Sequence, residues 1–184
     1  AGEGGPYKHY KQFYDYYGIY DYADAWALAA LDGTTLNTGT TAPAMLNFNF
    51  GAASDAARKE AVKKGTAYMH VWMYAIREFE DAIDDCTSCT TGCNTFSTND
   101  GGPVHAWDEG VAFYTGSREG TLPGGSTSGK MVYRLAEKRC GNFGTCLPRT
   151  KDAAGESQVN HALFKLFAQG RDLLHAGTCS GVRP

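Results

Sequence analysis

Apolar side chains recur at helical spacing from Ser54 to about Asp85, and this segment limits the possible folds more than any other. Neighbours on one face of a helix lie three or four residues apart, and the apolar positions keep that spacing. Ser54 or Asp55 can cap the first turn. No part of the chain alternates apolar and polar residues as a half-buried strand would. The apolar positions of this long predicted helix are Tyr68, Trp72, Ala75, Ile76, Phe79 and Ile83.

Four shorter segments also predict helices, each bounded by capping or breaking residues. Gly33 and Gly116 suit helix ends, because glycine adopts the left-handed backbone there at little cost. Pro103 suits a first turn, where its missing N–H is no loss. The sequence therefore predicts an all-α fold, an irregular bundle of about five helices with long loops pinned by disulfides, in a single domain (1–184).

The predicted parts follow one another along the chain. They are a tyrosine-rich segment (1–20), helices 21–33, 54–85, 103–116, 130–139 and 156–175, a long loop (34–54), and cysteine-bearing loops (86–103 and 140–146). On the last helix, the side chains expected to face inward are Val159, Leu163, Leu166, Phe167 and Leu174.

The size and charge of the chain exclude several classes of function. A chain of 184 residues can bury one substantial core. Its formal net charge of -3 lacks the basic excess typical of nucleic-acid binding. No stretch approaches the roughly 20 apolar residues of a membrane-spanning helix. We therefore expect a globular protein with no nucleic-acid partner and no membrane insertion.

The six cysteines lie in stretches rich in threonine, serine, glycine and asparagine, which is typical of loops. An even number placed this way favours disulfides and an oxidising compartment. Zinc is the alternative, but the pair Cys86 and Cys89 has no second pair to complete a four-ligand set. The chain opens on small residues, as a mature secreted protein does after its leader is removed. The expected bridges are Cys140 with Cys146, one within the cluster of Cys86, Cys89 and Cys93, and one from that cluster to Cys179.

The segment from His105 to Gly116 has the strongest candidate site. On a helix His105, Asp108 and Glu109 project from one face, because they lie three or four residues apart. An imidazole beside carboxylates is a ligand set for a hard or borderline metal ion. An amphipathic helix with a solvated charged face has the same pattern, and the sequence leaves both interpretations open. The opposite face, expected to pack in the core, consists of Val104, Trp107, Val111 and Tyr114.

A second acidic group lies near the end of the long predicted helix. Glu78 and Asp81 are three residues apart, and Asp85 continues their row. Like charges on adjacent turns destabilise a helix unless a cation is near, and Arg77 offsets only part of this repulsion. A bound metal ion would offset the rest, whereas a solvated acidic surface is the alternative.

Three stretches of the chain resemble the algal Fe-assimilating proteins, which are secreted periplasmic proteins induced by iron deficiency or high CO2. They are DAWALAALDG (24–33), HAWDEGVAFYTGS (105–117) and VNHALFKLF (159–167). Another iron-uptake family, the imelysin-type periplasmic proteins, has a G-x-H-x-x-E motif on a helix, and the segment 102–109 is similar to it. The segment departs from that motif, because its glycine lies one residue further from His105 and Asp108 precedes Glu109 at the acidic position.

The resemblance implies a secreted protein that binds iron, as Fe3+ or Fe2+, and assists iron assimilation at the cell surface without catalysis. Its partners would be the metal ion and a membrane iron transporter or a ferroxidase. Two other functions stay open: a metal-dependent enzyme using the same cluster, and a disulfide-stabilised structural protein of the cell surface. The implied ligands are His105, Asp108 and Glu109, with Glu78 and Asp81 from the long helix and Asp24 as an outer candidate.

Overall fold

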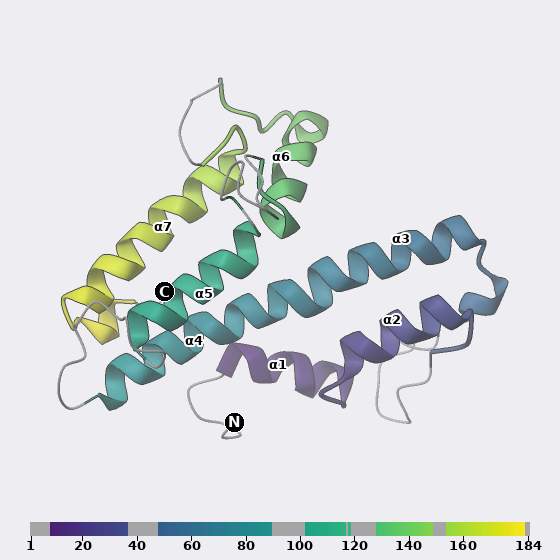
Figure 1. The fold of residues 1–184 in the computed structure, drawn as a ribbon, viewed down its shortest axis with the longest axis horizontal. Coiled ribbons are helices and arrows are strands. Elements are labelled where there is room, and N and C mark those ends of the chain that lie inside the picture. The colour runs from purple at the N-terminus through teal and green to yellow at the C-terminus, as the bar shows by residue number, and fades with distance from the viewer. Residues whose placement is uncertain are drawn as a thin grey trace. The chain divides into compact units, whose positions relative to one another are not determined.

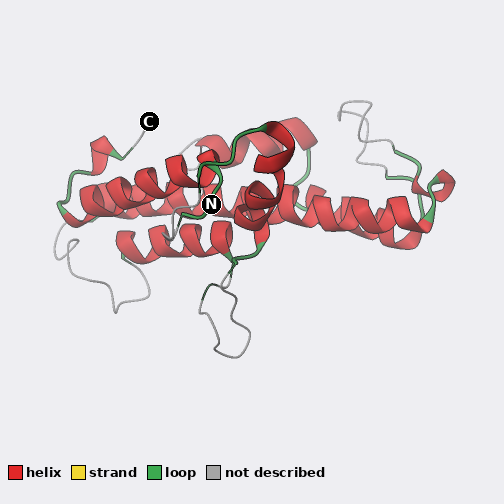
Figure 2. Cartoon of the chain, turned by 90° about the horizontal axis from the view of Figure 1, so that it is seen from above, coloured by secondary structure: helices red, strands yellow, loops and turns green. Residues whose placement is uncertain are grey.

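The computed structural model of the chain describes residues 8–36, 48–89, 102–116, 118, 128–148 and 154–182. Every regular element in these ranges is a helix, and the β-type pairing there is limited to two isolated bridges (Figure 2). The predicted all-α fold is therefore confirmed. No helix in the same ranges is both long and apolar enough to cross a membrane.

The chain separates into two compact units, which we call the N-terminal unit (Ala1–Ile76) and the C-terminal unit (Arg77–Pro184). The boundary falls within helix α4 (Trp72–Ser88). Figure 1 labels the helices and colours them by position along the chain. The single domain expected from the sequence stays a prediction.

The N-terminal unit contains helices joined by glycine-containing turns. Gly18, with φ of 79°, separates the first two helices, and Gly33 ends the second in the left-handed region as predicted. The Ser54 hydroxyl accepts a hydrogen bond from the Ala57 amide at 3.3 Å, so Ser54 caps the long helix. The elements are α1 (Lys8–Tyr17), α2 (Tyr22–Asp32), η2 (Phe50–Ala52), α3 (Asp55–Gly65), η3 (Thr66–Val71) and the start of α4.

Trp26 joins α2 to α3 in this unit. Its indole N–H donates to the carbonyl of Ala61 at 3.2 Å, and its ring meets Phe50 edge-on at 5.1 Å between centroids. The ring also lies against Gly65, where an added Cβ would come within 2.5 Å of it. Only glycine leaves room for this approach, so Gly65 sets how closely the two helices pack.

The long helix is not α-helical throughout, because η3 is a π-helical segment. The sequence predicted one continuous α-helix from Ser54 to about Asp85. The helical span begins as predicted and continues to Ser88, and the π turn was not expected. Tyr22 from α2 donates its hydroxyl to the carbonyl of Met69 within η3 at 3.3 Å. Burial raises the pKa of Tyr22, with Tyr10 and Tyr17 adding to the effect, so the hydroxyl keeps its proton. A carbonyl within the π segment thus accepts a hydrogen bond from another helix of the unit.

The C-terminal unit packs aromatic rings where its helices meet. The Phe79 ring, from α4, lies 4.6 Å from the ring of Trp107 and 5.4 Å from that of Phe167, between centroids. Trp107 donates its indole N–H to the carbonyl of Phe167 at 2.9 Å and lies against Gly170, where a Cβ would come within 2.0 Å of the ring. The further elements are α5 (Pro103–Thr115), α6 (Met131–Phe143), α7 (Gln158–His175) and η4 (Cys179–Gly181).

A buried polar network ties α5, α6 and α7 together. Asn160 on α7, 0% exposed, accepts from the Tyr114 hydroxyl at 2.6 Å and donates to the Glu137 carboxylate at 2.7 Å. Glu137 also accepts from the amides of Glu156, at 3.0 Å, and Ser157, at 2.9 Å, just before α7 begins. A carboxylate from α6 therefore satisfies amides that the start of α7 leaves without a helical partner.

The predicted bridge of Cys140 with Cys146 is confirmed, and so is a bridge from the cluster of Cys86, Cys89 and Cys93 to Cys179, in which the structure shows Cys86 as the partner. Cys89 is also disulfide-bonded, and Cys93 lies outside the described residues. The prediction that the cysteines lie in loops is wrong for Cys86 and Cys140, which are helical and only 4% and 2% exposed. Both helices extend beyond their predicted ends, and this carries each sulfur to a buried position.

The inward face of α7 also differs from the prediction. Phe167 and Leu174 are buried as expected, but Val159 is 52% exposed and Leu166 is 56% exposed. The buried row instead passes through Asn160, because its amide joins the polar network. Val159 and Leu166 each lie one position before a buried residue, Asn160 and Phe167, and therefore face solvent.

Candidate functional site

Helix α5 is fixed to the C-terminal unit by the face that the sequence predicted. Val104, Trp107 and Tyr114 are 5%, 8% and 1% exposed, and Val111 is half-buried. Pro103 occupies the first turn and Gly116 ends the helix, also as predicted. With this face held in the core, the polar face of α5 has a defined orientation.

On that polar face His105 and Glu109 lie side by side. The His105 Nε2 is 3.2 Å from the Glu109 Oε1, and the side chains are 37% and 47% exposed. Within the described residues, no other charged side chain lies within ion-pair distance of either of them. The pair therefore combines an imidazole nitrogen and a carboxylate oxygen at a spacing that one metal ion can bridge.

Asp108 is exposed on the same helix, one residue before Glu109. It lies three residues after His105, which places its carboxylate near the edge of the same face. No described side chain forms an ion pair with it. Asp108 is thus available to an incoming cation without the loss of an existing contact.

Glu78 and Asp81 on α4 are already paired with a cation. Arg77 Nη1 lies 3.1 Å from Glu78 Oε1 and 2.7 Å from Asp81 Oδ2. The Glu78 side chain is 3% exposed, so separating it from the guanidinium would leave a buried charge. Both residues could bind a metal ion only if Arg77 moved away, since the guanidinium repels a second cation at that place.

The acidic row continues to the end of α4, where the carboxylates affect one another. Burial raises the pKa of Asp85, and the negative charges of Asp81 and Asp84 raise it further, while Arg77 opposes the change. These charges attract cations to this end of α4. The predicted repulsion within the row is therefore present in the structure.

Asp24, the outer candidate, lies in the first turn of α2 and is exposed. It belongs to the N-terminal unit, whereas the other five candidates belong to the C-terminal unit. In the part of the chain that the structure describes, no three His, Cys, Asp or Glu side chains form a group that could hold a metal ion. The full six-residue ligand set stays a prediction, and the His105–Glu109 pair is the part of it that converges.

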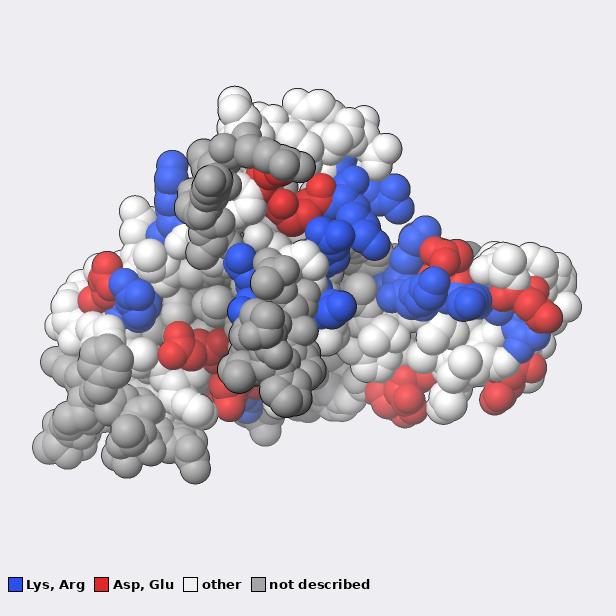
Figure 3. Space-filling model, turned by 45° about the horizontal axis from the view of Figure 1, so that its top comes forward, with Lys and Arg blue, Asp and Glu red and all other residues white. Residues whose placement is uncertain are grey.

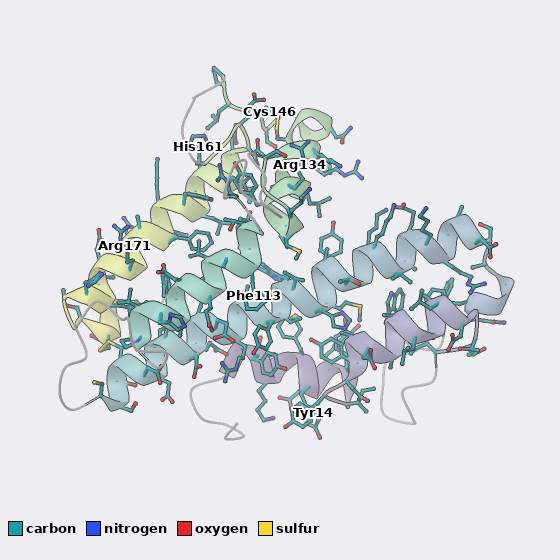
Figure 4. All side chains as sticks on the ribbon, in the orientation of Figure 1. Tyr14, Phe113, Arg134, Cys146, His161 and Arg171 are labelled. Carbon is teal, nitrogen blue, oxygen red and sulfur yellow. A yellow bond between two sulfur atoms is a disulfide. The ribbon has the colours of Figure 1, made fainter. Side chains whose placement is uncertain are left out.

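The Tyr114–Asn160–Glu137 network was not found from the sequence. Burial raises the pKa of Glu137, but hydrogen bonds from the Glu156 and Ser157 amides and from Asn160 outweigh this effect. The charge of Arg134 adds to the lowering, so the pKa lies below the ordinary value. Figure 4 labels Arg134, Cys146 and His161 in the same part of the unit. Asn160 in an otherwise apolar row is the one signal in the sequence that could have indicated a buried polar contact.

No family model, curated protein or solved structure matches this chain.

Proposed function

We propose that this protein is an extracellular iron-binding protein that captures the metal ion on the polar face of α5. The observation that carries the proposal is the 3.2 Å approach of His105 Nε2 to Glu109 Oε1 on a helix whose other face is fixed in the core. Because both side chains are on one rigid helix, little conformational entropy is lost when an ion binds them.

The chemistry of the pair favours iron. One imidazole and oxygen-rich neighbours suit iron better than copper or soft-ligand zinc sites. The His105 imidazole and the Glu109 carboxylate would supply two ligand atoms, and Asp108 is close enough along the helix to supply a further carboxylate oxygen. Water or a small anion would fill the other positions, so the ion would be held in an open shell and could be passed on.

The disulfides fit a site outside the cell. Cys86–Cys179 and Cys140–Cys146 form and persist in oxidising compartments and are rare where thiols are kept reduced. The resemblance to the algal Fe-assimilating proteins adds iron and the cell surface as the setting. In that setting the captured ion would be transferred to a membrane iron transporter or a ferroxidase.

The test is iron binding by the full chain and by a double variant, His105→Ala with Glu109→Ala. Ferric nitrilotriacetate in air and ferrous sulfate without oxygen serve as probes, and bound iron is counted by mass spectrometry after dialysis. We expect near-stoichiometric iron on the native protein and at least a tenfold loss of affinity in the variant, about 1.4 kcal/mol or more.

The matched control removes an acidic residue and a histidine from one face of α7, with Asp172→Ala and His175→Ala. We expect this variant to bind iron like the native protein. If the control loses as much iron as the α5 variant, binding is not specific to α5. If the native protein binds no iron in either oxidation state, the proposed function is wrong.

A further inference from the structure

The N-terminal unit contains a groove of about 410 Å³ between the end of α2 and the outer side of α3. Apolar side chains from both helices form much of its wall, including the 58% exposed Leu31. Exposed apolar surface of this kind is often a place where a ligand binds. The lining residues are Ala30, Leu31, Asp55, Arg58, Lys59, Val62 and Lys63.

Charges on the groove are unevenly distributed. Three cationic residues of α3 line it against a single carboxylate, that of Asp55. Figure 3 shows Lys and Arg side chains gathered along α3. A second groove on this helix, of about 380 Å³, is lined by Glu60 and Lys64, whose charges cancel. The first groove therefore favours an anion and the second does not.

The three cations have different roles. Arg58 uses its guanidinium to hold the end of α2, donating from Nε to the Ala30 carbonyl at 2.8 Å and from Nη2 to the Leu31 carbonyl. Lys63 pairs with Glu60 at 3.2 Å. Lys59 is exposed and has no ion-pair partner among the described residues. Lys59 is thus the cation that a ligand can engage without displacing another group.

Lys59 and Lys63 are four residues apart, so their like charges face each other on one side of α3 and destabilise the helix slightly. An anion between them would remove this repulsion. An apolar wall beside paired ammonium groups matches an anion that has an aliphatic tail. We propose that this groove binds a medium-chain aliphatic carboxylate. Its carboxylate lies at Lys59, Lys63 contributes its charge from the next turn while it remains paired with Glu60, and the tail lies against Leu31 and Val62.

The test titrates the full chain with sodium octanoate below its micelle concentration and follows the methyl NMR signals of Leu31 and Val62. We expect saturable shifts at one site and weaker binding as salt is added, because the contact is partly ionic. Replacing both cations, Lys59→Gln with Lys63→Gln, should weaken binding about tenfold. Lys59 and Lys63 are both exposed, so replacing them should leave the native fold intact, which circular dichroism can confirm.

Three comparisons can overturn the proposal. Lys64→Gln is the matched control, since Lys64 lines the second groove and pairs with Glu60 at 3.7 Å; it should leave octanoate affinity unchanged. Equal binding of acetate would show that the tail is not recognised. Equal binding of 1-octanol would show that the charge is not recognised. If octanoate causes no methyl shifts at Leu31 and Val62, the groove does not bind aliphatic carboxylates.

Discussion

The two units contain the same kind of tryptophan–glycine contact, but the tryptophan is buried to a different extent in each. In each, a tryptophan lies against a glycine of a neighbouring helix and donates its indole N–H to a carbonyl about one turn before that glycine. Trp26 meets Gly65 and the Ala61 carbonyl, and Trp107 meets Gly170 and the Phe167 carbonyl. Trp107 is 8% exposed, whereas Trp26 is only half-buried.

The comparison bears on the two proposed sites. The C-terminal unit also contains disulfides, and its buried polar network holds α5, which carries the His105–Glu109 pair, through Tyr114 and Asn160. Large apolar side chains are exposed in both units, and in the N-terminal unit Leu31, at 58%, lines the groove beside α3. A metal pair benefits from a rigid support, while a groove for an apolar ligand requires accessible surface.

The largest expected effect comes from truncating the two tryptophans. Trp107→Ala should destabilise the C-terminal unit by about 3–5 kcal/mol, because it removes a buried ring and leaves a cavity. Trp26→Ala should cost about half as much, since part of that ring is already in water. Urea unfolding measures the free energy of unfolding of both variants, and hydrogen exchange shows which unit is destabilised. Equal losses would show that burial depth does not distinguish the two contacts.

The second effect comes from the disulfide that joins α4 to η4. Removing it with Cys86→Ser and Cys179→Ser should cost about 2–4 kcal/mol, because the bridge spans 93 residues of sequence. The bridge from Cys140 to Cys146 spans only 6, so its removal should cost less. Thermal unfolding of the two variants compares them. A greater loss from the shorter bridge would point to native-state packing as the source of stability.

The smallest effect concerns Glu137 and has a distinct pH dependence. Its pKa is lowered in the folded protein, so the carboxylate stabilises the fold above its unfolded pKa, and this contribution is lost as the pH falls through the folded pKa. At neutral pH Glu137→Gln should cost about 1 kcal/mol, a figure reduced for partial solvent screening.

The difference in unfolding free energy between Glu137→Gln and the native protein should shrink as the pH falls below 4.5, the ordinary value for glutamate. Lys138→Gln, an exposed neighbour on α6, serves as the control and should show no such trend. A difference that stays constant from neutral to acidic pH would mean that the carboxylate charge does not stabilise the start of α7.

Local spacing was enough to predict several features correctly. The period of apolar residues placed the helices, Pro103 and Gly116 bounded α5, and its core face followed from the same period. The pairing of Cys140 with Cys146 was also correct, as was the bridge from the 86–93 cluster to Cys179, although its partner Cys86 was not specified. The tyrosine-rich segment was not recognised as helix α1, because its ring contacts depend on α2. The Tyr17 ring, for example, stacks on Tyr22 at 4.2 Å between centroids.

The sequence by itself determined which residues share a helix face, because helical geometry fixes that from spacing alone. His105 and Glu109 were adjacent for that reason. Only the tertiary structure decided that Arg77 holds Glu78 and Asp81, and that Asn160 is buried with Tyr114 and Glu137. Partners distant in the chain decide which rotamer a long charged side chain adopts and which polar groups meet between helices. The spacing of residues along one helix carries no information about those partners.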